Sequence, residues 1–162
     1  MIVVADTSVI LNLCLIGKEG LLSQLFGKIL CPTLVHAEFA RLTDCDPRFS
    51  GLVFPGFIGV MPAGRIRTDL KLNHRIHDGE IEAISLALNS NAKALLMDER
   101  AGRQAAYALG IQCIGILGIL LQAKSLGLIE SVSPLIGQLV SLGRFWMAPG
   151  LLKRILEAAD EA

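Results

Sequence analysis

Short apolar runs that end at an acidic residue limit the folds open to this chain more than any other feature of the sequence. Residues 2–5 lead into Asp6, and residues 94–97 lead into Asp98. A continuous apolar run of this length is typical of a strand that is buried on both faces of a parallel sheet. The sequence predicts two further strands at residues 29–31 and 111–114, and a short one near residues 57–61.

Segments with helical periodicity separate these runs. They cover residues 9–13, 20–26, 32–42, 80–88, 99–109, 116–126, 132–142 and 151–159, whereas residues 43–64 read mostly as loop. Strands that alternate with helices form a parallel sheet covered by helices on both faces. We predict one α/β domain over residues 1–162, a three-layer α/β/α fold with a mainly parallel sheet, and C-terminal helices at about 132–159 packed on it.

The composition narrows the functional classes. Hydrophobic residues make up 52% of the chain, and 15 basic residues balance 15 acidic ones, so only a local patch could attract a polyanion. The four cysteines lack C-x-x-C spacing, which argues against a zinc ribbon and favours buried thiols in a reduced cytoplasmic protein. The N-terminus is no signal peptide, and no apolar stretch reaches the ~18 residues of a membrane span.

Four acidic residues on separate segments converge at one edge of the predicted sheet. Asp6 and Asp98 follow strands, Glu80 lies in the first turn of a crossover helix, and Glu38 lies early in the helix after the second strand. Parallel α/β sheets place their sites at the carboxyl ends of the strands. Converging carboxylates repel one another unless a cation neutralises them, and an all-oxygen set selects Mg²⁺ or Mn²⁺. Such a site suits phosphodiester hydrolysis.

Each acid also has a structural interpretation. Asp6 and Asp98 could cap helices, Glu38 could pair with Arg41, and Glu80 could complement a helix N-terminus. None of these roles requires four acids at one edge of one sheet, so the set carries the metal-site hypothesis better than any member does.

The motifs around these acids resemble the PIN-domain (PilT N-terminus-like) ribonuclease family, in particular a prokaryotic PIN-like subgroup. Asp6 lies in V-V-A-D-T-S, Glu38 in H-A-E-F, Glu80 in D-G-E-I-E-A-I and Asp98 in L-L-M-D-E-R; the run I-G-I-L-G-I-L-L adds to the likeness. Glu80 stands where the family usually has an aspartate. Asp98 is preferred as the fourth acid because it follows the strand directly, with adjacent Glu99 as the alternative and Ser8 as a supporting hydroxyl.

The resemblance implies Mg²⁺- or Mn²⁺-dependent cleavage of single-stranded RNA by Asp6, Glu38, Glu80 and Asp98. It also implies a homodimer and an antitoxin protein as partner, since such proteins are often the toxin of a toxin–antitoxin pair. The apolar residues 116–121 and the sequence Phe145-Trp146-Met147 favour self-association as well, unless the last helices bury them within one chain.

A basic segment precedes the third acid. Arg65, Arg67 and Arg75 are candidates for contacts with the RNA backbone, as are Arg100 and Arg103 beside the fourth acid. The alternative is that these arginines form ordinary solvated faces.

Other function classes fit less well. A haloacid-dehalogenase-type phosphatase would carry D-x-D after the first strand, and here Ser8 stands at the second position. A receiver domain would need paired acids after that strand. A PIN-fold module that binds nucleic acid but cleaves it weakly or not at all remains open, because Glu80 departs from the usual aspartate.

Overall fold

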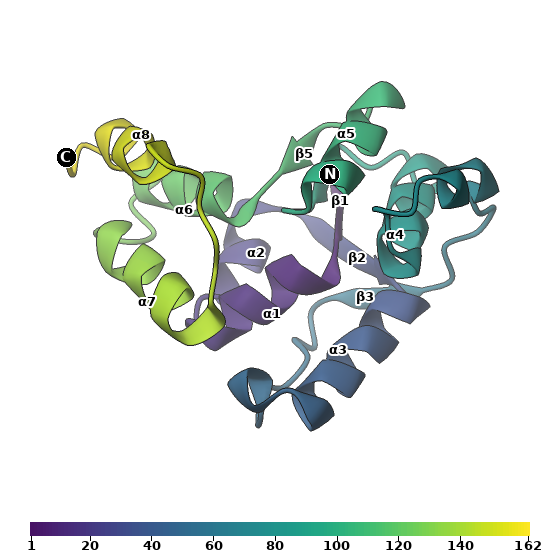
Figure 1. The fold of residues 1–162 in the computed structure, drawn as a ribbon, viewed down its shortest axis with the longest axis horizontal. Helices are drawn as coiled ribbons and strands as arrows, with labels where there is room; N and C mark the ends of the chain where they lie inside the picture. The colour runs from purple at the N-terminus through teal and green to yellow at the C-terminus, as the bar shows by residue number, and fades with distance from the viewer.

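The chain forms a five-stranded parallel sheet with helices on both faces (Figure 1). The structure is a computed structural model that describes residues 1–162. The strands are β1 (Ile2–Ala5), β2 (Lys28–Pro32), β3 (Gly59–Met61), β4 (Ala94–Leu96) and β5 (Cys113–Ile114). Their order is β3-β2-β1-β4-β5, and all four neighbouring pairs are parallel. The predicted three-layer α/β/α fold is confirmed.

Eight α-helices match the eight predicted segments. They are α1 (Thr7–Leu15), α2 (Gly20–Leu25), α3 (Thr33–Cys45), α4 (Asp78–Asn89), α5 (Arg100–Ala108), α6 (Ile116–Ser125), α7 (Ser133–Gly143) and α8 (Leu151–Ala158). Two short 3₁₀ helices, η1 (Pro47–Phe49) and η2 (Thr68–Leu72), were not predicted. A 3₁₀ helix of three to five residues has too few turns to leave a periodic pattern in the sequence.

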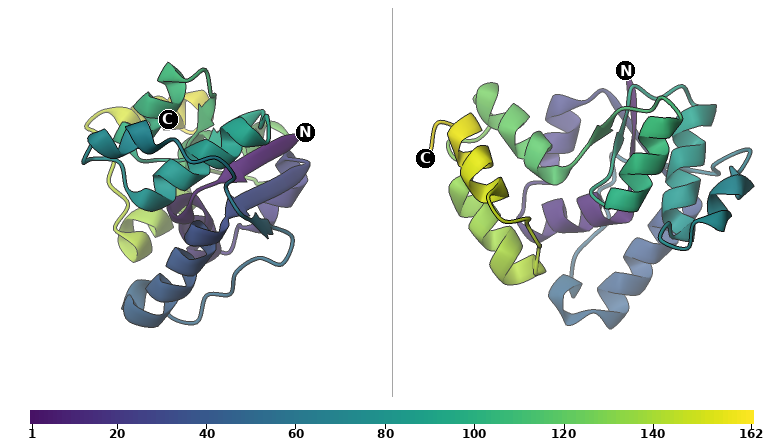
Figure 2. Two further views of the ribbon diagram at one scale, coloured as in Figure 1. Left: turned by 90° about the vertical axis from the view of Figure 1, so that its right-hand side faces the viewer. Right: turned by 45° about the horizontal axis from the view of Figure 1, so that its top comes forward.

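The two faces of the sheet support separate hydrophobic clusters. Val3 and Ala5 point into one cluster, which contains side chains of α1, α2, α3, α6 and α7. Val4 points to the other face and packs with side chains of α4 and α5. Figure 2 shows the helices on the two sides of the strands. Because both faces of β1 are dry, this strand has no polar residue before Asp6.

The strand order opens a crevice between β1 and β4. The chain passes from β1 outward to β2 and β3, then crosses to the other side of β1 to form β4 and β5. The connections that leave β1 and β4 therefore diverge, which is where parallel sheets bind ligands. The backbone N–H of Asp6 donates to the Leu96 carbonyl at 3.0 Å, so the carboxyl ends of both strands lie side by side.

The C-terminal helices pack on the rest of the chain through α6. Ile116, Ile119 and Leu120 are fully buried within the single chain. Near the C-terminus, the Glu161 carboxylate accepts hydrogen bonds from the backbone N–H groups of Val132 and Ser133 and forms an ion pair with a lysine of α6. These hydrogen bonds lower the pKa of Glu161 to about 2.

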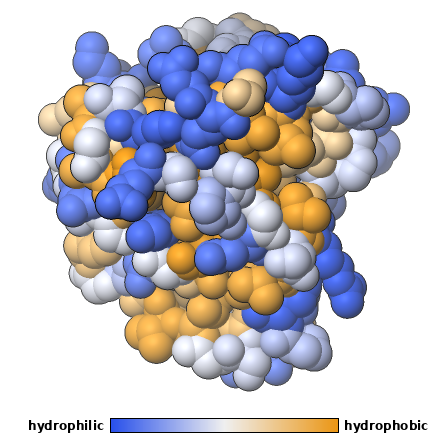
Figure 3. Space-filling model, turned by 90° about the vertical axis from the view of Figure 1, so that its left-hand side faces the viewer, coloured by the Kyte–Doolittle hydropathy of each residue, from blue (hydrophilic) through white to orange (hydrophobic).

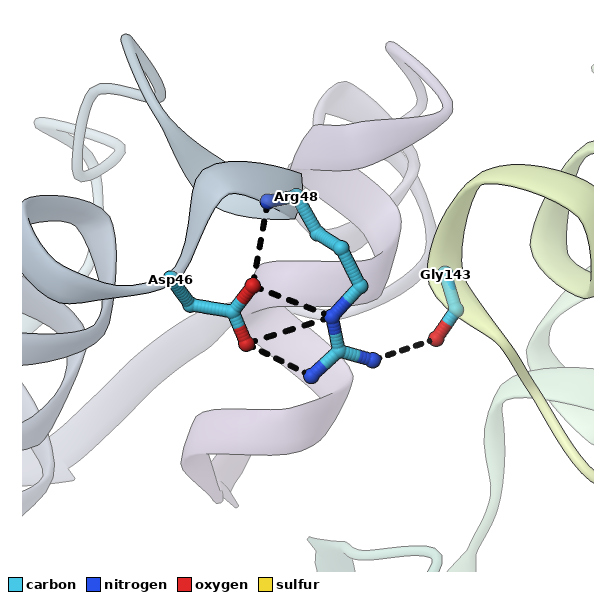
Figure 4. Close-up of polar contacts among 3 residues, drawn as sticks. All are labelled: Asp46, Arg48 and Gly143. Atoms are coloured by element: carbon cyan, nitrogen blue, oxygen red, sulfur yellow. Dashed lines mark hydrogen bonds and ion pairs between the residues drawn. The ribbon is translucent and has the colours of Figure 1, made fainter.

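A second polar contact fixes the end of α7. The Arg48 guanidinium forms a two-pronged ion pair with Asp46, with a shortest distance of 2.6 Å, and donates through Nη1 to the Gly143 carbonyl at 2.9 Å (Figure 4). The side-chain and backbone hydrogen bonds from Arg48 lower the pKa of Asp46. Because η1 and α7 lie almost 100 residues apart in the chain, this contact holds the start of the α7–α8 connection against the body of the molecule.

The structure bears on two expectations, that the cysteines are buried free thiols and that no segment is long enough to span a membrane. Cys14, Cys31 and Cys113 are buried free thiols, as predicted, whereas Cys45 at the end of α3 is exposed. No helix combines the length and hydrophobicity needed to cross a bilayer.

Exposed apolar side chains remain on the C-terminal side of the molecule. Leu126, Val140, Leu142 and Leu152 are each at least 45% exposed. Figure 3 shows apolar patches separated by hydrophilic side chains on the side that carries α6, α7 and α8. Most α6 side chains that suggested self-association are buried within the monomer, and Leu121 is half-buried. Trp146 is 78% exposed, so the remaining argument for a dimer rests on Trp146 and this exposed set.

We expect the protein to form a dimer through the exposed leucine and valine side chains of α7. Analytical ultracentrifugation at micromolar concentration should give twice the 17.4 kDa mass of one chain. Replacing Val140 and Leu142 together by Ser should shift the protein to the monomer. The matched change Val53→Ser, at a valine that is 80% exposed elsewhere, should leave the dimer intact. A wild-type monomer would contradict the expectation.

Candidate metal centre

Asp6 is a buried acid at the centre of the sheet edge. Its side chain lies directly after β1 and is only 4% exposed. Burial raises its pKa to about 8; the backbone N–H of Thr7 opposes the shift, and the charges of Glu80, Glu38 and Glu99 add to it. Asp6 occupies the N-cap position of α1 without a capping hydrogen bond from its side chain. The capping interpretation therefore does not account for Asp6.

Glu38 projects from α3 toward the same place. Its Oε2 atom accepts a hydrogen bond from Thr7 Oγ1 at 3.2 Å. Gly79, at the start of α4, leaves room for this carboxylate, since a Cβ atom there would lie 2.8 Å from Glu38 Oε2. Glu38 forms no ion pair with Arg41, so the surface-pair interpretation is not realised.

Glu80 lies in the first turn of α4 and is 4% exposed. Its Oε2 atom accepts a hydrogen bond from the backbone N–H of His77 at 3.3 Å, as in a capping box. Burial raises its pKa; His77 opposes the shift, and the charges of Glu99 and Glu38 add to it. Glu80 thus both caps its helix and faces the other acids. Its structural role at the helix N-terminus and its role in the acidic cluster are compatible.

Asp98 and Glu99, adjacent in sequence, differ in burial: Asp98 is half-buried and Glu99 is exposed. Asp98 Oδ1 accepts the backbone N–H of Ile116 at 3.0 Å, which caps α6. Burial raises the pKa of Asp98 to about 6, the Ile116 hydrogen bond and the charge of Arg103 oppose the shift, and Glu99 adds to it. The charge of Glu99 raises the pKa of both Asp6 and Glu80. Because Asp98 already accepts the Ile116 N–H, Glu99 becomes the fourth acid of the proposal below, and the choice between the two stays a prediction.

The chemistry of this cluster fits a hard divalent cation. Asp6, Glu38, Glu80 and Glu99 offer only oxygen ligands, and the charges of Glu38 and Glu99 raise the pKa of both Asp6 and Glu80. As the side chains stand, no three His, Cys, Asp or Glu residues form a closed metal-binding group. The cluster is thus a set of facing acids whose repulsion a cation would relieve.

Comparison with known proteins places this arrangement in a family. The family model DUF3368, described as a PIN domain, matches residues 2–161. The chain belongs to the PIN-domain family. PIN domains are nuclease-type folds that typically use divalent metal ions.

A solved structure shares the fold. It is a PilT N-terminus domain protein, SSO1118, from the hyperthermophilic archaeon Sulfolobus solfataricus P2. The TM-score is 0.55 at 21% sequence identity, and the match covers 76% of this chain and 93% of that chain. No curated protein matches the chain.

The basic segment of this PIN domain runs along α4 and is only partly beside the acids. The Arg65 carbonyl accepts a hydrogen bond from Asn89 at the far end of α4, about 14 Å along the helix from Glu80. Arg67 forms an ion pair with Asp69 at 2.8 Å. Arg75, exposed near the start of α4, is the one arginine of the three that lies at the acidic end.

Arg100, Arg103 and Ser8 lie on the other side of the acids. They line a cleft between α1, α5 and the C-terminal helices, together with Glu99. Arg103 donates through Nη1 to the Met97 carbonyl at 3.4 Å. Ser8 Oγ is buried and has no hydrogen-bond partner.

Sequence reasoning missed two residues of the site. The Thr7 hydroxyl donates to Glu38, although the sequence assigns Thr7 no role of its own. Gly79 leaves space for the same carboxylate, which the sequence does not indicate either. The D-T-S and D-G-E motifs held both residues, but only the packing of α1, α3 and α4 shows which carboxylate they serve.

The raised pKa of Asp6 predicts how the metal-free protein responds to pH. Between its ordinary value of 3.8 and about 8, the folded protein holds a proton on Asp6 that the unfolded chain has lost. The free energy of unfolding should therefore fall as pH rises through this window. Asp6→Asn removes this contribution, so the variant should gain stability relative to wild type from pH 5 to pH 8. Denaturant unfolding in EDTA measures the difference.

A matched control is Asp44→Asn, at an exposed carboxylate of α3. It should leave the pH dependence of wild type unchanged. A constant stability difference between Asp6→Asn and wild type across this pH range would show that Asp6 is not held protonated by burial.

Proposed function

We propose that this PIN domain is an Mg²⁺- or Mn²⁺-dependent endoribonuclease that hydrolyses phosphodiester bonds of single-stranded RNA. One observation carries the proposal: the buried acid Asp6 lies among the carboxylates of Glu80, Glu38 and Glu99, whose charges all raise its pKa. A carboxylate set of this kind is costly to keep unless a cation binds to it, so selection for binding a cation explains why it persists.

In the proposal, Asp6, Glu38, Glu80 and Glu99 hold the cation. A bound divalent ion supplies a Lewis acid that activates water and stabilises charge on the phosphodiester. The chain itself orients the ligands: the Thr7 hydroxyl fixes Glu38, and the His77 backbone N–H fixes Glu80. Outer-shell hydrogen bonds of this kind hold metal ligands in place and tune the metal.

Arginines on both sides of the acids support a polyanionic substrate. Arg75 lies beside the start of α4, and Arg100 and Arg103 line the cleft beside Glu99. Cations that flank a metal site hold the phosphate backbone in register while the metal acts on one bond. Single-stranded RNA rather than duplex, a toxin role and an antitoxin partner come from the family resemblance alone. Purification from the native host without a second protein would count against the antitoxin.

Substitution of the acids distinguishes the two candidates for the fourth ligand. With Mn²⁺ and a mixed-sequence single-stranded RNA, Asp6→Asn and Glu99→Gln should each lower the cleavage rate by more than the 10–100-fold typical of outer-shell partners. Asp98→Asn should cost much less, because an amide oxygen can still accept the Ile116 N–H. Gel analysis of cleavage products measures the rates.

The control is Glu82→Gln, on α4 two residues from Glu80, which should cleave like wild type. A larger loss for Asp98→Asn than for Glu99→Gln would restore Asp98 as the ligand. Cleavage by none of the proteins, combined with retained RNA binding, would favour the alternative of a binding module.

The position of Arg75 predicts a salt effect on RNA binding. Arg75→Gln should weaken binding and make the slope of log affinity against log salt shallower by about 0.7, the value for one contact with single-stranded nucleic acid. Arg65→Gln, a matched change at the far end of α4, should leave the slope unchanged. Fluorescence anisotropy at several salt concentrations measures both slopes. Equal effects of the two changes would mean that the whole segment, and not its acidic end, binds RNA.

A further inference from the structure

A cleft with a volume of about 950 Å³ separates the acidic end of the sheet from the C-terminal helices. Its walls are α1, α5, β5, the first turn of α6, α8, and the connection between α7 and α8. We call it the C-terminal cleft. Because Glu99 and Ser8 line it, the C-terminal cleft opens beside the proposed metal site.

Three residues that line the C-terminal cleft each hold a buried polar atom with no hydrogen-bond partner. These atoms are Ser8 Oγ, Asn12 Oδ1 and Asp98 Oδ2; the one other such atom in the chain, Glu19 Oε2, belongs to a residue that does not line it. Leaving a buried polar group unsatisfied is unfavourable, and native structures rarely do so without a reason. Three of the four unpaired atoms belong to residues of this cleft, which indicates that the cleft binds a ligand that forms hydrogen bonds.

The hydrogen bonds of these residues fix what the partner must supply. Asp98 Oδ1 already accepts the Ile116 N–H, so Oδ2 remains as an acceptor. The Asn12 amide nitrogen donates to the Ser8 carbonyl at 2.9 Å, so its oxygen remains as an acceptor. A ligand that reaches these two oxygens from the cleft must therefore donate hydrogen bonds to them.

The arginines at the rim of the cleft add a second requirement, a negative charge on the ligand. Arg100, Arg103 and Arg144 line the C-terminal cleft, and none of them forms an ion pair. Guanidinium groups bind phosphate by parallel hydrogen bonds. The ligand thus combines hydrogen-bond donors with a negative charge.

An aromatic side chain completes the set. Trp146, the single tryptophan of the chain, lines the cleft and is 78% exposed. The Arg48–Gly143 hydrogen bond fixes the start of the segment that carries it (Figure 4). Exposed aromatic rings beside arginines are the usual stacking platforms for unpaired bases.

We propose that the C-terminal cleft binds one nucleotide of the single-stranded RNA substrate and selects a base with an exocyclic amino group. The base stacks on Trp146, its amino group donates to Asp98 Oδ2 or Asn12 Oδ1, and arginines of the rim bind the neighbouring phosphate. Uracil has no amino group and leaves these acceptors less well satisfied. The inference rests on the proposed nuclease function, because it assigns a subsite to the same substrate.

Tryptophan fluorescence tests the inference without catalysis. The full chain is titrated in EDTA with cytidine and uridine trinucleotides, and Trp146 reports stacking directly because no other tryptophan contributes. Cytidine should quench the fluorescence and bind about three- to thirty-fold more tightly than uridine, as expected for one or two hydrogen bonds. Equal affinities would overturn the inference.

Asp98→Asn tests the direction of the hydrogen bond. The amide oxygen must face the Ile116 N–H, which leaves the amide nitrogen as a donor in the cleft. The preference for cytidine over uridine should then fall or reverse. Arg144→Gln should weaken both trinucleotides alike, whereas Arg154→Gln, an exposed arginine of α8 outside the cleft, should change neither. An unchanged preference in Asp98→Asn would contradict the assignment.

The outcomes separate this inference from the nuclease proposal. Metal-dependent cleavage without base-selective quenching would reject the subsite and leave the nuclease. Base-selective quenching without cleavage would retain the subsite on a binding module. Quenching by an arginine-containing peptide but by no trinucleotide would overturn the inference in favour of a protein partner.

Discussion

The burial of one carboxyl group, that of Asp6, is the constraint on which the site depends. The group lies at the end of a central strand whose two faces are both covered by helices, so solvent reaches only 4% of the residue. Burial alone would favour the protonated form, and the neighbouring carboxylates act in the same direction. A dry sheet that ends in an acid thus creates, by its own architecture, a place where a cation is favourable and an additional negative charge is not.

The parallel topology supplies the other acids. Since β4 crosses to the far side of β1, the residues after both strands meet at one crevice, while α3 and α4 start at the same edge and bring Glu38 and Glu80 there. Adjacent Asp98 and Glu99 then divide two tasks. Asp98 caps α6, and the charge of Glu99 acts on Asp6, while both residues line the C-terminal cleft.

The fold followed from the sequence because its signals are strong and local. The uninterrupted apolar run before Asp6 and the alternation of strands with helices specify a parallel sheet, and the motifs around the four acids resemble the family that the comparison confirmed. The choice between Asp98 and Glu99 could not follow, because it depends on which way two adjacent side chains turn. The hydrogen bond between Asn89 and the Arg65 carbonyl also depends on tertiary contacts, as does the burial of Leu117 and Leu120 of α6 within one chain.

Proton release on metal binding is the most direct test of the central claim, that the acidic cluster holds a divalent cation. At pH 7 a pKa of about 8 leaves Asp6 largely protonated, and a ligand carboxylate must lose its proton to bind metal. Calorimetric titration with Mn²⁺ in buffers of different ionisation enthalpy should therefore detect the release of nearly one proton per bound ion. Absence of Mn²⁺ binding, or binding without proton release, would contradict the account.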